Sequence, residues 1–187
     1  PITLHPDGRK AHPPHLSTVR DGWRTLRFFL MYSPKWLFFY PGAALAFLGA
    51  VAYAMAMPGI EVRGIVFDVH TLLVGSLALL MGWQTVLFGL FTRVFAVSEG
   101  LVPRDPQLER AQRILTLERG LSFGAAAFVV GIGLIAFAFD VWRRADFGPL
   151  HYATTMRIVI PGMTLGALGF QTVLSSFFLS ILGMRRR

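Results

Sequence analysis

Three arginines with helical spacing are the residues of this 187-residue chain that best fit a binding site. Arg20, Arg24 and Arg27 recur at intervals of four and three, which places their side chains on one face of a helix. Guanidinium groups bind phosphate oxygens through paired hydrogen bonds, and Lys35 follows just before an apolar segment. These four residues predict a site for the phosphate of a lipid carrier. The alternative is a solvated face that binds bulk anionic lipid.

Two glutamines are the most polar side chains within the apolar segments. Gln84 and Gln171 each occupy the third position of the pattern Gly-aromatic-Gln-Thr-Val-Leu, which occurs at 82–87 and again at 169–174. Amide side chains in lipid hydrogen-bond between helices, so we expect both glutamines to make interhelical contacts, with a lipid headgroup as the alternative partner. The repeated pattern predicts a duplicated hairpin, although two apolar helices can also match by chance.

Other chemistry lacks the residues that it needs. Asp68 and His70 lie two positions apart without a supporting cluster of acids or histidines, and two ligands do not make a metal site. The sequence has no phosphate loop, no Gly-x-Ser-x-Gly, no His-Glu-x-x-His and no cysteine. We therefore expect no catalytic residue, no metal site and no cofactor in this chain.

The composition indicates an integral membrane protein. Hydrophobic residues make up 54% of the chain, and its charges gather in a few short segments, whereas a soluble domain spreads them along amphipathic elements. Lys and Arg outnumber Asp and Glu by 18 to 10. Because most of this excess flanks apolar runs, membrane topology and anionic lipid explain it better than nucleic acid does.

The expected fold is an all-α membrane protein. We expect an amphipathic helix over 15–35 that lies in the membrane interface, because a stripe with Trp runs beside the arginines. Its alternative is a helix packed on a soluble domain. A short cytoplasmic helix over about 106–117 connects two hairpins. The four transmembrane helices of the membrane domain, 36–187, are expected at 36–57, 70–97, 121–143 and 156–184.

The distribution of positive charge predicts the orientation. If the N-terminus is cytoplasmic, fourteen Lys and Arg residues lie inside and four, including Arg157, lie in outside loops. Both termini are then cytoplasmic, and we expect a multi-pass protein of the bacterial inner membrane. The second and fourth spans run in the same direction, which makes the hairpins parallel repeats. The first and third spans share no comparable motif.

Residues 1–14 form a polar, proline-rich segment. It begins with a strand-like run at 2–5, followed by a turn, and one short strand cannot bury itself. It either lies on the surface or is the last strand of a domain that is otherwise missing. We interpret it as the remnant of the end of a cytoplasmic domain, and the chain as a fragment or a processed product.

Several stretches resemble the junction between the catalytic and membrane domains of bacterial family 2 glycosyltransferases of the dolichol-phosphate mannosyltransferase-like type. The N-terminal ones read PITLHPDGR, RDGWRTLR and YSPKWLF, and further similar stretches lie at 67–72, 94–101, 115–120 and 175–183. In that family a cytoplasmic catalytic domain ends in a strand, passes through amphipathic helices and enters the membrane. The likeness covers essentially the whole chain, but only the membrane part of the family.

The resemblance implies transfer of a sugar from a nucleotide donor to polyprenyl phosphate. The family's metal-binding acidic motif and its base lie in the catalytic domain, and no position here matches them. We therefore expect a membrane anchor and lipid-carrier platform that is noncatalytic in isolation. Its expected partners are the bilayer, polyprenyl phosphate, a separate or missing catalytic domain, and a homo-oligomer or larger complex. The alternatives are a structural accessory subunit of a larger membrane complex and a four-span flippase of lipid-linked sugars.

Overall fold

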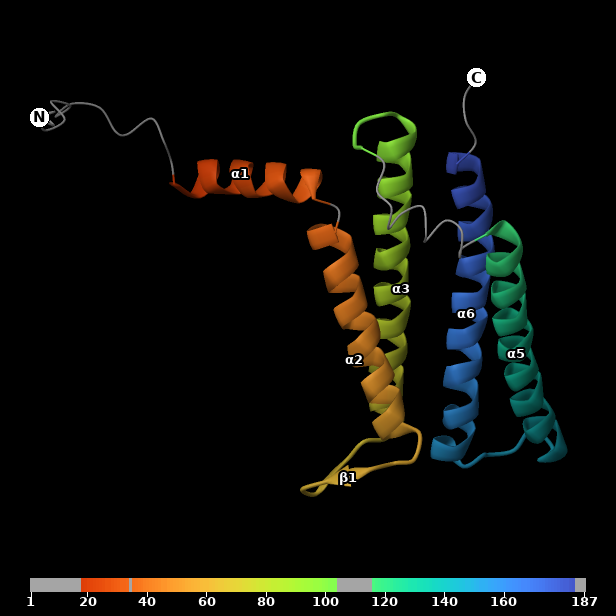
Figure 1. Cartoon of the computed structure of the whole chain (residues 1–187). Helices are drawn as coiled ribbons and strands as arrows, with labels where there is room; N and C mark the ends of the chain where they lie inside the picture. Colours follow the sequence, from red (N-terminus) through yellow and green to blue (C-terminus); the bar gives the residue numbers. More distant parts are fainter. Residues whose placement is uncertain (1–17, 34, 104–115, 184–187) are drawn as a thin grey trace, which may run out of the picture. The chain divides into compact units, whose positions relative to one another are not determined.

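The fold consists of long apolar helices. A computed structural model describes residues 18–33, 35–103 and 116–183 (Figure 1). The chain divides into two compact units, Pro1–Ser33 and Pro34–Arg187. The second unit contains four helices that are long and apolar enough to cross a membrane, which confirms the expected all-α membrane fold.

The first unit contains helix α1 (Thr18–Tyr32). Residues 15–17 of the predicted helix 15–35 lie outside the described residues, and the helix ends at Tyr32, three residues before the predicted end. It stops two residues before Pro34, because a proline disfavours helical backbone in the residue that precedes it. The strand-like run at 2–5 lies outside the described residues.

The first span begins with a π-helical turn. Helix η1 (Lys35–Phe39) leads directly into α2 (Tyr40–Ala56), and together they form an apolar stretch of 22 residues. Pro41 has no N–H and its ring clashes with the carbonyl one turn earlier. A wider turn at this point accommodates the ring.

The other spans start earlier than predicted. They are α3 (Val69–Ser98), α5 (Leu117–Arg144) and α6 (Tyr152–Gly183). Helix α5 starts early because the hydroxyl of Thr116 caps it by accepting the Arg119 N–H at 3.4 Å. Helix α6 also starts early, at Tyr152, so Arg157, counted above with the outside loops although the predicted span 156–184 includes it, lies within a helix. The connecting helix predicted at about 106–117 falls almost wholly on residues outside the described ranges.

A small β-hairpin joins α2 to α3, where a plain loop was expected. Strands β1 (Glu61–Val62) and β2 (Ile65–Val66) pair antiparallel, with Glu61 opposite Val66. The turn residues Arg63 and Gly64 have φ angles of 53° and 81°. Two consecutive positive φ values match the turn that best suits the twist of a tight hairpin.

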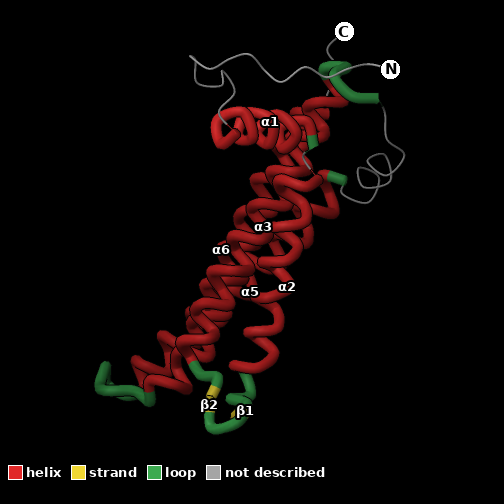
Figure 2. The backbone as a smooth tube through the Cα atoms, turned by 90° about the vertical axis from the view of Figure 1, so that its left-hand side faces the viewer, coloured by secondary structure: helices red, strands yellow, loops and turns green. Residues whose placement is uncertain are grey.

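The spans pack as two hairpins. Helix α2 packs on α3, α5 packs on α6, and α3 lies beside α6 in the middle (Figures 1 and 2). Helices α3 and α6 run in the same direction, as the parallel repeat requires. Residues 57–68 and 145–151 lie at one end of the bundle, which we name the loop end.

Glycines bring the backbones of each hairpin into contact. A Cβ atom on Gly82 would lie 2.5 Å from the backbone nitrogen of Ala46 and 2.7 Å from the Gly42 carbonyl oxygen. A Cβ atom on Gly169 would collide with the backbone of Phe128 and Gly124 in the same way. Small residues allow helices in lipid to approach this closely, so both hairpins use the same joint.

The first and third spans do share a motif, so the statement that they do not is wrong. Each has two glycines seven residues apart that face two glycines of its partner helix at the same spacing. The equivalent glycines are Gly42 and Gly124, Gly49 and Gly131, Gly75 and Gly162, and Gly82 and Gly169. Scattered glycine and alanine identities in a long apolar helix carry little signal until the contacts are known, and these contacts support a duplicated hairpin.

Substitution of Gly82 by Val should separate α2 from α3. The added side chain meets backbone that cannot move aside, and overpacking of this kind costs about 1–3 kcal/mol. We expect a lower unfolding temperature by circular dichroism in detergent. Gly133→Val is the matched control, because a Cβ atom there has nothing within 4 Å. Equal destabilisation by both substitutions would contradict the glycine joint.

Candidate functional site

The predicted phosphate-binding arginines lie together on α1. Arg20, Arg24 and Arg27 are all exposed, and none of them forms an ion pair with a residue in the part of the chain that the structure describes. Val19 and Trp23 beside them are also exposed, at 86% and 63%. A helix with neighbouring cationic and apolar stripes can place one stripe among acyl chains and the other among phosphates.

Lys35 is the fourth predicted site residue. It is exposed at the start of η1 and belongs to the second unit. The three arginines therefore share one helix of the first unit, whereas Lys35 belongs to the second unit.

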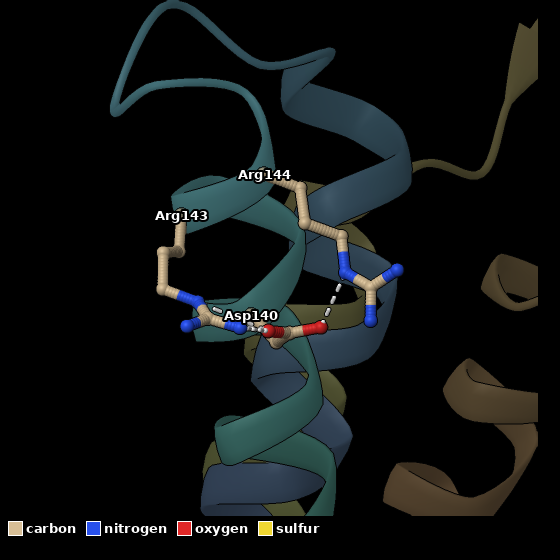
Figure 3. Close-up of polar contacts among 3 residues, drawn as sticks. All are labelled: Asp140, Arg143 and Arg144. Carbon is tan, nitrogen blue, oxygen red and sulfur yellow. Dashed lines mark hydrogen bonds and ion pairs between the residues drawn. The ribbon is translucent and has the colours of Figure 1, made fainter.

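Three of the four arginines at or near the loop end have carboxylate partners. The Asp140 carboxylate accepts hydrogen bonds from Arg143 at 2.7 Å and Arg144 at 2.6 Å, all on the last turns of α5 (Figure 3). Arg157 on α6 donates to Asp68, the residue before α3, at 3.1 Å. Because these three cations already have a carboxylate partner in the chain itself, the arginine row on α1 is the better candidate for an anionic ligand.

The repeated Gln motif joins the two hairpins through its neighbouring residues. The indole Nε1 of Trp83 donates to the Thr172 hydroxyl across the α3–α6 contact, at 3.1 Å. Within the described residues, Gln84 and Gln171 do not hydrogen-bond to each other, and Oε1 of Gln171 is buried without a partner. The interhelical role of the glutamines stays a prediction. The contact between Trp83 and Thr172 was not expected from the sequence, although both residues belong to the same motif.

A second polar contact joins the hairpins nearer the loop end. The Tyr53 hydroxyl on α2 donates to Thr164 of α6 at 2.9 Å and lies 2.7 Å from the Ser76 hydroxyl of α3. Ser76 and Thr164 are both buried. A hydrogen bond between helices in lipid is worth about 0.6–2 kcal/mol, so this cluster helps to hold α6 against the first hairpin. Residues 18–33, 35–103 and 116–183 contain no group of three or more His, Asp or Glu placed to hold a metal ion.

Comparison with known proteins identifies the family. The model of the glycosyltransferase family 2 C-terminal transmembrane region matches residues 90–183, which is half of the chain. The chain belongs to this family. The resemblance to family 2 glycosyltransferases is thereby confirmed, and the matched residues run from the C-terminal part of α3 to the end of α6.

A curated relative covers nearly the whole chain. The low-salt glycan biosynthesis hexosyltransferase Agl6 of Haloferax volcanii is 35% identical over an alignment of 188 positions that covers 98% of this chain. The chain spans 43% of the length of that relative. No solved structure matches the chain.

Replacement of Tyr53 by Phe tests the contact between the hairpins. The change removes the hydroxyl that reaches both Ser76 and Thr164, while those two residues keep their bonds to carbonyls of their own helices. We expect a loss of about 1 kcal/mol in the free energy of unfolding, measured by denaturant titration in mixed micelles. Tyr40→Phe is the control, because Tyr40 is 51% exposed; an equal effect of both changes would argue against the contact.

Proposed function

We propose that this chain is the membrane anchor and lipid-carrier platform of a polyprenyl-phosphate glycosyltransferase, and that it is noncatalytic in isolation. The observation that carries the proposal is the exposed row of Arg20, Arg24 and Arg27 on α1, next to an apolar stripe. Guanidinium groups suit a phosphate because their N–H groups match two of its oxygens at once. Membership in a family of glycosyltransferase membrane regions supplies the context.

The catalytic domain is the proposed partner. The relative is named a hexosyltransferase, and this chain corresponds to 43% of its length. Sugar transfer therefore belongs in our proposal to a domain outside the 187 residues, on the same polypeptide or on a separate one. The transmembrane region would hold the carrier while that domain supplies the sugar.

The proposed orientation places both termini on the cytoplasmic side. Fourteen of the eighteen basic residues then lie inside, in accord with the bias of cytoplasmic loops toward Lys and Arg. The arginine row would lie at the inner surface, where a nucleotide sugar is available. Three of the four arginines on the other side are the ones paired with Asp68 and Asp140.

Replacement of Arg20, Arg24 and Arg27 together by Gln tests the binding site. Loss of hydrogen bonds to a charged group costs about 1.5–3 kcal/mol, so we expect the affinity for polyprenyl phosphate to fall about tenfold or more. Binding of vesicles that contain phosphatidylglycerol should fall less. The measurement is titration of the lipid into the chain in nanodiscs.

Two further variants separate guanidinium recognition from plain charge. The triple Lys variant keeps the charge but loses the planar fork, so it should bind polyprenyl phosphate nearly as weakly as the Gln variant. Replacement of Arg63, Arg143 and Arg144 by Gln removes the same charge from the loop end and should leave binding unchanged. Full binding by the Lys variant would reduce the arginine row to a generic anionic-lipid surface.

The purified chain should transfer no sugar on its own. We expect no incorporation of label when the chain is mixed with a radioactive nucleotide hexose, a divalent cation and polyprenyl phosphate, because its proposed role is to hold the carrier. The full-length relative serves as the positive control. Any transfer above the level of empty nanodiscs would overturn the noncatalytic assignment.

A further inference from the structure

An apolar groove opens at the loop end of the second hairpin. It encloses about 400 Å³ between α5 and α6, and its lining is mostly apolar. Ile135, Ala138, Phe139, Met156 and Val159 are among the residues that line it. We name this feature the second groove.

The first hairpin has the same groove, and there it is filled. The glycine contacts align the two: a Cβ atom on Gly75 would touch the Tyr53 ring at 3.2 Å, and one on Gly162 would touch Ile135 at 3.1 Å. This alignment pairs four residues that line the second groove with four residues of the first hairpin. The pairs are Tyr53 and Ile135, Ala56 and Ala138, Val69 and Met156, and Leu72 and Val159.

Helix α6 of the same chain occupies the first groove. Ile160 packs with Ala56, Val69 and Leu72, and Leu72 is fully buried as a result. Two polar contacts hold α6 there. They are Thr164 with Tyr53 and Arg157 with Asp68.

The contact between the hairpins is therefore heterologous. The first hairpin contributes a groove, and the second hairpin contributes a ridge on α6 that is formed by Ile160 and Thr164. The same alignment places Leu73 and Leu77 of α3 where Ile160 and Thr164 lie on α6. Leu73 and Leu77 are 59% and 58% exposed, so each chain keeps one ridge and one groove without a partner from its own described residues.

We propose that a second copy of this chain fills the second groove with the ridge formed by Leu73 and Leu77 of its α3. This contact would repeat, between copies, the one that joins the two hairpins within a chain. The ion pair of Arg157 with Asp68 has a different equivalent in the contact between copies. There Thr155 is equivalent to Asp68, and His70 is equivalent to Arg157. A threonine hydroxyl and an imidazole can hydrogen-bond without an ion pair, so the joint needs no buried charge.

Two copies close the assembly. Val159 lines the groove and the adjacent Ile160 forms the ridge, and neighbouring residues on a helix point about 100° apart. Heterologous contacts form a ring when the rotation between units closes. The groove and the ridge of one hairpin therefore face about a right angle apart, so successive hairpins are rotated by about a right angle. Four such hairpins complete a ring, and two chains supply four hairpins. This inference stands independently of the proposed function, because it uses neither the arginine row nor a lipid carrier.

Single cysteines test the joint directly, since the chain has none of its own. One differently tagged copy carries Leu73→Cys and the other carries Val159→Cys, so no disulfide can form within a chain. We expect oxidation in native membranes to give the mixed disulfide dimer. The matched control combines Leu73→Cys with Phe137→Cys, which lies next to the groove residue Ala138 but faces outward with 56% exposure; it should give none. Equal cross-linking of both pairs would overturn the proposal.

The mass of the assembly provides a second measurement. Native mass spectrometry from nanodiscs should show twice the 20.8 kDa of the chain. Val159→Trp fills the groove and should shift the population to single chains. Val129→Trp, at a position on α5 that is 67% exposed, should leave the dimer intact. A single chain in the unmodified protein, a larger multiple, or a Val159→Trp variant that stays dimeric would each contradict closure through this groove.

Discussion

Direct contact between glycine backbones is the interaction on which the whole membrane region depends. Lipid tails are as apolar as leucine, so burial of apolar side chains does not drive helices together within the bilayer. At Gly42 and Gly82, and again at Gly124 and Gly169, a carbonyl of one helix faces the Cα of the other. Such contacts gain dispersion and weak Cα–H···O bonds, and glycine loses no side-chain entropy when it is packed.

The contact between hairpins has a different chemical character from the contact within them. Helix α6 meets the first hairpin through side chains: Ile160 in an apolar cluster, the hydroxyl of Thr164 and the guanidinium of Arg157. Side chains can differ between two copies of a duplicated unit, whereas a backbone contact tolerates only small residues. The two copies of the hairpin therefore share the same glycine contact between their helices, but they differ in the side chains on their outer surfaces.

The sequence predicted the elements better than their contacts. Apolar length located the four spans, and the repeated Gln motif located the two helices that lie side by side. It could not show that Trp83 and Thr172 make the bond between them, because periodicity identifies a helix face but not which polar groups meet across it. The contact of Arg157 with Asp68 was missed for a related reason, because it depends on how α6 packs beside α3.

The candidate site was predictable only as a pattern. The spacing of Arg20, Arg24 and Arg27 indicated that the three residues share one face of a helix, and all three lie on α1. That other arginines are matched by carboxylates depends on contacts such as Arg144 with Asp140, which the sequence does not reveal. The grooves were equally hidden, since their residues are ordinary apolar ones until Gly75 and Gly162 align the two hairpins.

The β-hairpin between α2 and α3 limits how the region can move. Its paired residues Glu61 and Val66 close a connection of fixed length, and Gly49 and Gly75 engage the two helices directly below it. A shift of one helix past its partner by a turn, about 5.4 Å, would break both. Piston motion within the first hairpin is thereby blocked, and any mechanical coupling across the bilayer is left to rocking of one hairpin against the other at the side-chain joint of α3 and α6.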